Sequence, residues 1–179
     1  MTTHPVPRSL VVVSLVLGAG SAAAQTLPKA PCALLKPAEI QALAPSAKIG
    51  SGVPSTDTTT GMYAACEYEW GPSSREWGTS SVQVMVIDVS KSLPGHDPET
   101  IREGLLSQVV VGGPNASQIV GVGAAAAFLP SDQHPTIQAT AEAYVRAKGV
   151  LLTVSYHGGN ALGSKDKLTV LLKAAAARL

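Results

Sequence analysis

Charged and aromatic residues are scarce in this chain. Of its 179 residues, 14% are charged and 4% are aromatic, whereas 45% are hydrophobic. Lys and Arg together number 13 and Asp and Glu number 12, so the two signs of charge nearly balance. Nucleic acids, anionic membrane surfaces and strongly charged substrates are bound through a field of one sign, which this composition does not supply. The sequence therefore predicts a folded globular protein whose partners are not nucleic acids.

Long hydrophobic runs are also missing. A helix that crosses a membrane needs roughly 20 consecutive apolar residues. The most apolar stretch of the chain runs from Leu10 to Leu17, and the glycine at position 18 follows it directly. No later segment is long enough to span a bilayer. We therefore expect a protein without a membrane span.

The stretch from Leu10 to Leu17 fits a secretory signal instead. Arg8 supplies the positive charge before it, and Ala22 and Ala24 lie at the two positions where signal peptidase requires small side chains. We expect cleavage directly before Gln25 and a soluble periplasmic or secreted product. Without Arg8, the remaining chain has 12 basic and 12 acidic residues, which gives a net charge of zero with His neutral.

Only two cysteines are present, Cys32 and Cys66. An even pair in an exported protein is typical of one structural disulfide, which stabilises a loop of this length by about 4 kcal/mol in the chain-entropy account. A redox or nucleophilic thiol is the alternative, but the pair lacks Cys-x-x-Cys spacing and a nearby His. Acylation of Cys32 needs a small-residue box before it, and Lys29-Ala30-Pro31 does not form one. We expect the disulfide.

The first half of the mature chain alternates between helical and strand patterns. Residues 31–43 predict a turn followed by a helix, with apolar positions near one face. Residues 46–61 are rich in Gly, Ser, Thr and Pro and predict a loop. Residues 65–70 alternate between the two faces of a half-buried strand. Residues 71–78 form a predicted connection, and residues 81–89 form the strongest strand pattern.

The second half continues in the same way. Residues 97–109 predict an amphipathic helix with an Asp N-cap and a Pro at its first position. Residues 119–129 predict a turn that leads into a short strand. Residues 141–156 predict a hairpin that turns at Lys148-Gly149. Ser164 is placed to cap a last, leucine-rich helix.

This order, one helix, two strands, one helix, three strands and one helix, predicts an α+β domain. Adjacent strands favour a single antiparallel sheet flanked by helices, with one disulfide. We expect residues 1–24 to be the signal peptide, residues 25–30 a short tether and residues 31–179 a single domain.

The pattern resembles a family of secreted bacterial proteins of unknown function, many of them actinobacterial lipoproteins. The shared features are a Cys-x-Leu-Leu-x-Pro-Ala-Glu helix, a Cys-containing strand, a helix, a Gly-x-Gly-x-x-Ala strand, a Lys-Gly hairpin and an Ala/Leu-rich terminal helix. Here they correspond to Cys32–Glu39, Cys66–Trp70, Asp97–Val111, Gly121–Phe128, Lys148-Gly149 and Lys165–Leu179. The resemblance implies a compact α+β fold, similar to PsbP-type domains, with a disulfide and no known catalysis. Two departures are the missing lipobox and Ala124, where an acidic residue is expected.

Two short motifs resemble catalytic or cofactor sites. Residues 121–126 match a dinucleotide fingerprint, which requires a preceding strand, a following helix and an acid about 20 residues on. The strand-like continuation favours a turn. Ser164 and Lys167 have Ser-x-x-Lys spacing, but Ser131-Asp-Gln133 only approximates the second element of such enzymes and the third is missing. A helix N-cap is the better interpretation, and we expect no cofactor.

The three histidines of the mature chain suggest no metal site or hydrolase. His157 precedes two glycines, as in the oxyanion loop of esterases, but no Gly-x-Ser-x-Gly elbow accompanies it. His96 and His134 lie beside prolines, and no ligand spacing such as His-x-x-x-His links the three. Glu67 and Glu69 share one strand face, where we expect solvent rather than a glycosidase pair.

The two tryptophans are the most informative aromatic residues. Trp70 has the same strand phase as Cys66, which predicts that it belongs to the core. Trp77 lies off that phase, in a predicted loop, where an exposed indole can stack on a ligand or anchor a partner. We therefore take Trp77 as a candidate contact residue.

No catalytic arrangement emerges from these residues. We expect a non-enzymatic, exported protein that binds a small ligand or a protein partner in the cell envelope. A small secreted hydrolase is one alternative, and an accessory subunit of an envelope complex is another. A cluster of polar groups that converge in a pocket would favour the hydrolase, and a large exposed apolar patch would favour the subunit.

Overall fold

A computed structural model describes residues 27–74, 78–131, 137–158 and 161–179. Its helices are α1 (Pro37–Leu43), α2 (Val89–Ser92), α3 (Pro98–Val111) and α4 (Lys165–Ala176), with 3₁₀ turns at Pro31–Ala33, Arg146–Lys148 and Ala161–Gly163. Its strands are β1 (Val53–Thr56), β2 (Tyr63–Ser74), β3 (Gly78–Asp88), β4 (Ser117–Gln118), β5 (Ala125–Ser131), β6 (Ile137–Val145) and β7 (Val150–Gly158).

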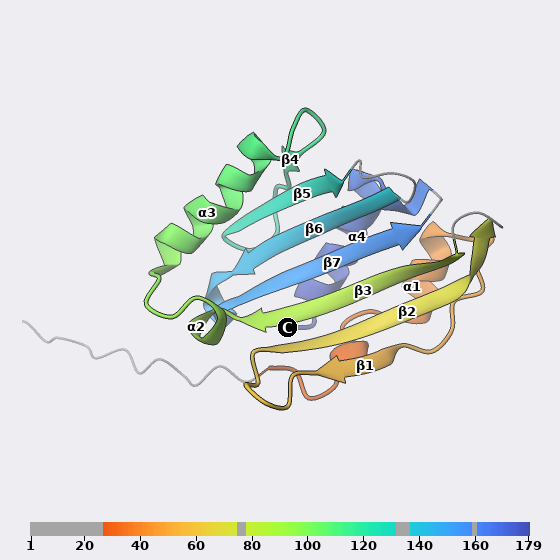
Figure 1. Cartoon of the computed structure of the whole chain (residues 1–179), viewed down its shortest axis with the longest axis horizontal. Helices are drawn as coiled ribbons and strands as arrows, with labels where there is room; N and C mark the ends of the chain where they lie inside the picture. Colours follow the sequence, from red (N-terminus) through yellow and green to blue (C-terminus); the bar gives the residue numbers. More distant parts are fainter. Residues whose placement is uncertain (1–26, 75–77, 132–136, 159–160) are drawn as a thin grey trace, which may run out of the picture.

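The strands form one antiparallel sheet in the order β1-β2-β3-β7-β6-β5-β4. The helices lie on both faces of this sheet (Figure 1). α1 and α4 cover one face, and α3 lies on the other, over β5 and the neighbouring strands β6 and β4. This arrangement confirms the predicted α+β class with a single antiparallel sheet and one disulfide.

The alternation of β2 orients the sheet. Cys66, Tyr68 and Trp70 are buried on the α1 and α4 face, whereas Glu67 and Glu69 point to the opposite face. The strand phase therefore predicts correctly which side chains enter the core.

The core on the α1 and α4 face is the larger of two. Three leucines of α4 are fully buried there, Leu168, Leu171 and Leu172. On the opposite face, Ile101 and Leu105 of α3 pack in a smaller cluster with Tyr144 of β6 and with Ala125 and Ala127 of β5. The small alanine side chains of β5 and β6 let a helix lie close to the sheet on each side.

The segment before α1 is tied to the sheet at several points. Cys32 and Cys66 form the predicted disulfide, with Cα atoms 5.0 Å apart. The hydroxyl of Tyr68 lies within hydrogen-bond distance of the carbonyl oxygens of Cys32, at 2.9 Å, and of Leu35, and its one O–H is shared between them. Cys32 lies in the 3₁₀ turn that precedes α1, so the bond joins this turn, rather than the helix itself, to β2.

The predicted helix over residues 97–109 is confirmed as α3. The Asp97 carboxylate accepts hydrogen bonds from the backbone N–H groups of Glu99 and Thr100, and Pro98 takes the first helical position. The hairpin at Lys148-Gly149 is also confirmed, because Gly149 adopts a left-handed conformation with φ of 58° between β6 and β7.

Four elements differ from the sequence prediction. The expected loop over residues 46–61 contains the edge strand β1, and the two-residue strand β4 forms the other edge. The expected connection over residues 71–78 is mostly strand, because β2 continues to Ser74 and β3 begins at Gly78. The short helix α2 follows β3 directly. The order is therefore a helix, three strands, two helices, four strands and a helix.

No helix in the described ranges is long and apolar enough to cross a membrane.

Candidate functional site

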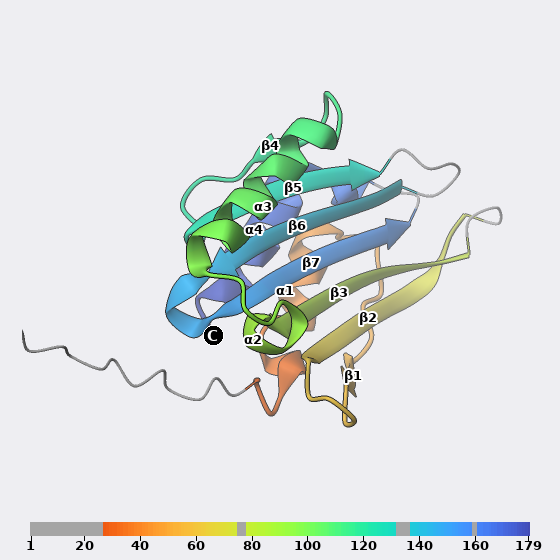
Figure 2. The ribbon, with the colours of Figure 1, turned by 60° about the vertical axis from the view of Figure 1, so that its left-hand side comes forward.

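The face of the sheet that carries α3 is only partly covered. α3 packs against β5 and β6, while β2, β3 and β7 are turned toward the viewer in both Figure 1 and Figure 2 and are open over most of their length, with the short helix α2 at the end of β3. Several side chains on this part of the face are polar and half-buried, among them Glu67, Gln83 and Ser155. The boundary between the covered and open parts is where the structure has its candidate site.

A groove with a cavity of about 290 Å³ lies at this boundary. We call it the α3 groove. It is formed by the segment before α3, one side of α3, and strands β6 and β7, and its lining residues are Leu93, His96, Thr100, Ile101, Gly104, Leu105, Gln108, Glu142 and Leu151. Its volume is close to the lower end of the range for small-molecule sites, about 300 to 1,000 Å³.

The walls of the α3 groove are mainly aliphatic. Ile101 and Leu105 are buried, and Leu93 and Leu151 are half-buried beside them. Gly104 leaves an opening in the α3 wall, since a Cβ atom added there would meet no other atom within 4 Å. Glycine inside a helix costs about 1 kcal/mol relative to alanine, and here no crowding at the Cβ position requires it.

Glu142 is the one charged residue of the groove lining other than the titratable His96. It lies on β6, opposite Thr153 of β7 and Ala127 of β5. Within the described ranges it forms no ion pair, and its carboxylate accepts no hydrogen bond. Burial raises the pKa of Glu142 above its ordinary 4.5, and no neighbouring charge contributes to the shift.

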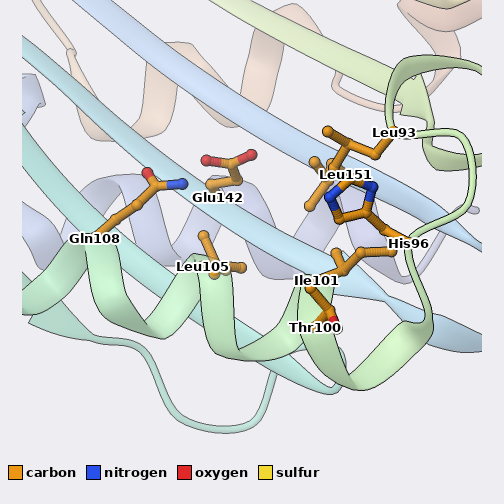
Figure 3. A pocket seen from close by; sticks show the side chains of 9 residues that line it. Leu93, His96, Thr100, Ile101, Leu105, Gln108, Glu142 and Leu151 are labelled. Atoms are coloured by element: carbon orange, nitrogen blue, oxygen red, sulfur yellow. The ribbon is translucent and has the colours of Figure 1, made fainter.

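The groove has a polar end and an apolar end. Figure 3 shows the carboxylate of Glu142 beside the amide of Gln108, with Leu105 next to them, and Leu93, Leu151 and His96 farther along the groove. The strand register agrees, because Leu151 pairs with Tyr144, two residues beyond Glu142 on β6. An occupant of the groove would meet a carboxylate at one end and aliphatic side chains at the other.

A second hollow, of about 280 Å³, lies on the open part of the same face. We call it the polar cleft. Its lining residues are Glu67, Ser81, Gln83, Gln138, Thr140, Ser155, Tyr156 and His157. Ser81 of β3 is the direct cross-strand neighbour of His157 of β7, so a nucleophile and a base do share this cleft.

The rest of the polar cleft differs from a hydrolase site. In a catalytic triad the imidazole lies between the nucleophile and a carboxylate. Here Gln138 flanks His157 on the side away from Ser81, and Glu67 lies on β2, with β3 between it and β7. At the usual strand spacing, β2 and β7 are therefore about 10 Å apart. The register therefore favours a solvated polar surface over a triad.

The predicted contact residue Trp77 lies outside the described residues, as do His134 and the proposed cleavage site at Ala24 and Gln25. Trp70 is buried and stacks on Tyr156 with ring centroids 6.3 Å apart, which confirms its place in the core. His96, which sequence considerations left without a role, is exposed at the apolar end of the α3 groove.

The two motifs that resemble enzyme sites have structural explanations. Gly121 and Gly123 have φ of 80° and 59°, and they lead into strand β5 rather than into a helix, so the predicted turn is confirmed. Ser164 occupies the N-cap position of α4, although its side chain makes no capping hydrogen bond. Lys167 donates a hydrogen bond to the carbonyl oxygen of Leu43 at 3.0 Å, which joins α4 to α1.

Sequence considerations did not find the α3 groove. Glu142 falls on the polar phase of β6, where a solvent-facing side chain is expected. Gly104 inside an amphipathic helical pattern was the one available signal, because an isolated helical glycine often has a packing or functional reason. Among the described residues, no group of three or more His, Cys, Asp or Glu side chains could hold a metal ion.

These features define a protein with an α+β fold, one antiparallel sheet and one disulfide. Comparison of the chain with protein-family models, curated proteins and solved structures finds no match.

Proposed function

We propose that this protein is an exported, non-enzymatic module of the bacterial cell envelope that binds a small apolar ligand in the α3 groove. The observation that carries the proposal is the cavity of about 290 Å³ whose walls are aliphatic side chains and a helical glycine. A concave, mainly apolar site with few polar groups is the usual form of a small-molecule site.

Export is supported by two observations. The first residues have the pattern of a signal peptide, and the Cys32–Cys66 disulfide fits an oxidising compartment. Expression of the full chain in a bacterial host, followed by N-terminal sequencing of the periplasmic or secreted protein, should give Gln25 as the first residue. Recovery of the protein only in the cytoplasm, with Met1 retained, would refute export.

Ligand binding can be tested with a neutral apolar compound, 3-phenylpropan-1-ol. In ¹H–¹⁵N spectra of the purified protein, we expect it to shift the amide signals of α3, β6 and β7 and to leave those of α1 unchanged. The variant Gly104→Leu should abolish these shifts because its side chain fills the groove. Its free energy of unfolding should stay equal or rise by up to about 1 kcal/mol, since leucine replaces glycine inside a helix.

Ser107→Leu is the matched control for this experiment. It introduces the same side chain at an exposed position of α3 that does not line the groove, so the shifts should persist. Binding that persists in Gly104→Leu, or shifts confined to other parts of the molecule, would overturn the α3 groove as the site.

A further inference from the structure

The α3 groove contains a carboxylate that has no partner among the residues that the structure describes. Glu142 is half-buried at the polar end of the mainly aliphatic groove and has neither an ion pair nor an accepted hydrogen bond within the described ranges. An ionised carboxylate loses favourable hydration in such surroundings, and the loss is recovered only when a donor or a cation meets it.

We propose that the ligand of the α3 groove is an organic amine, with a protonated nitrogen that pairs with Glu142 and an apolar body that lies against Leu93 and Leu151. This inference rests on the proposed function, since it assigns a chemical class to the ligand of the same groove. Charge complementarity carries it, because a hydrogen bond between an ammonium group and a carboxylate is roughly twice as strong as one between neutral groups.

Among the described residues, the basic side chains of Lys and Arg lie outside the lining of the α3 groove. Arg102, the nearby arginine of α3, is paired with Glu99 at 2.5 Å and also approaches Glu103. The residues beside Glu142 on the adjacent strands, Thr153 and Ala127, are uncharged. A positive charge beside Glu142 would therefore come from a ligand.

Gln108 adds a second acceptor at the polar end. Its amide lies beside the Glu142 carboxylate in Figure 3, with the nitrogen nearer to the carboxylate. Rotation of the amide by about 180° would bring its carbonyl oxygen to this side, where it can accept another N–H of an ammonium group. A primary or secondary amine can use both acceptors, whereas an alcohol has one donor. The pair therefore favours a nitrogen that carries at least two hydrogens.

The length of the ligand follows from the strand register. Leu151 pairs with the residue two positions beyond Glu142 on β6, and two residues of strand span about 7 Å. A ligand that bridges the two ends needs an amine, a spacer of a few carbons and a compact apolar group. The cavity of about 290 Å³ does not accommodate a peptide helix or a polymer chain.

Three compounds of nearly equal size separate the possibilities: 3-phenylpropylamine, 3-phenylpropan-1-ol and 3-phenylpropanoate. Isothermal titration at pH 7 should give an affinity for the amine at least about tenfold above that for the alcohol, as expected for a charge-assisted hydrogen bond. The carboxylate should bind more weakly than the alcohol because Glu142 repels it.

The variant Glu142→Gln keeps the size of the side chain and removes its charge. It should lower the affinity for the amine about tenfold while the affinity for the alcohol changes less than about twofold. Glu103→Gln, an exposed substitution on α3 outside the groove, is the matched control and should leave both affinities unchanged.

The outcomes distinguish this inference from the proposed function. If the amine and the alcohol bind equally, and Gly104→Leu abolishes both, the groove binds small molecules and the assignment of an amine is wrong. An equal loss of both ligands in Glu142→Gln also overturns the assignment. If neither compound binds the wild-type protein, both the assignment and the proposed function fail.

Discussion

On the α1 and α4 face of the sheet, polar side chains join separate segments, whereas on the α3 face a carboxylate lies in a groove without a partner among the described residues. Tyr68 shares its one O–H between two carbonyl oxygens of the N-terminal segment. Arg178 forms two hydrogen bonds with the Glu39 carboxylate and a third, at 2.8 Å, with the carbonyl oxygen of Leu34. The first face therefore gains stability from its polar groups.

The two glutamates show the difference most clearly. The hydrogen bond from Arg178 lowers the pKa of Glu39 below its ordinary 4.5. Burial raises the pKa of Glu142 above the same value. A partner stabilises the first carboxylate in its charged form, and an apolar environment destabilises the second. This contrast supports the proposal that the α1 and α4 face holds the fold together and that the α3 face carries the function.

The largest expected effect comes from removing the disulfide, which lies on the α1 and α4 face and should affect stability without affecting the α3 groove. The double variant Cys32→Ser with Cys66→Ser should lower the free energy of unfolding by about 4 kcal/mol, because the bond closes a segment of 34 residues. Urea denaturation measures the loss. Where the variant is still folded, its affinity for 3-phenylpropylamine should equal that of the wild type, and a parallel loss of affinity would show that the faces are coupled.

A smaller effect is expected at Gly52, where the chain beside β1 passes over the disulfide. A Cβ atom at this position would lie 2.7 Å from Cε1 of Tyr68 and closer still to Sγ of Cys66. Gly52→Ala should therefore cost about 1 to 3 kcal/mol in the free energy of unfolding, as overpacking does elsewhere.

Gly50→Ala is the matched control for this substitution. Its Cβ atom would lie 3.6 Å from the carbonyl oxygen of Glu69, which is ordinary contact. Equal free energies of unfolding for the two variants would contradict the close packing that the structure gives the disulfide region.

The ion pair of Glu39 predicts a still smaller, pH-dependent effect. Because the pKa of Glu39 is lowered in the folded state, its contribution is present above pH 4.5 and is lost as the pH falls below that value. Glu39→Gln should lower the free energy of unfolding by about 1 kcal/mol at pH 7, the upper range for an exposed pair. Denaturation at pH 7 and pH 3 checks this, and a loss that persists at pH 3 would contradict the ion-pair explanation.

Sequence patterns predicted the central strands and the long helices because burial imposes a period on them. Cys66, Tyr68 and Trp70 show the period of a strand, and Leu168 and Leu172 that of a helix. The edge strand β1 gives no such signal, since all four of its residues are exposed and one is a proline, which edge positions tolerate.

The candidate site could not be predicted from the same patterns. Gln108 and Glu142 come from different elements, and only tertiary packing brings them together beside Leu151. The polar phase of β6 places Glu142 on the face opposite the main core, to which its neighbours Ala141 and Ala143 belong. It did not reveal that α3 covers this part of the face, because alternation along a strand gives the side of the sheet and not what lies over it.

The most direct test of the account is the pH dependence of stability in Glu142→Gln. In the wild type the raised pKa of Glu142 means that its charge opposes folding, with no cost below the ordinary pKa of 4.5 and an increasing cost as the pH rises through the raised value. His96 also titrates among the residues that line the groove, and this variant leaves it unchanged.

Urea denaturation of wild type and Glu142→Gln, without and with saturating 3-phenylpropylamine, gives the decisive comparison. Without the amine we predict that the variant is more stable than the wild type at pH 7 and equal to it at pH 3.5. With the amine at pH 7, the wild type should gain more stability than the variant. A variant that is less stable than the wild type without the amine would show that the Glu142 carboxylate serves the fold, and would contradict the account.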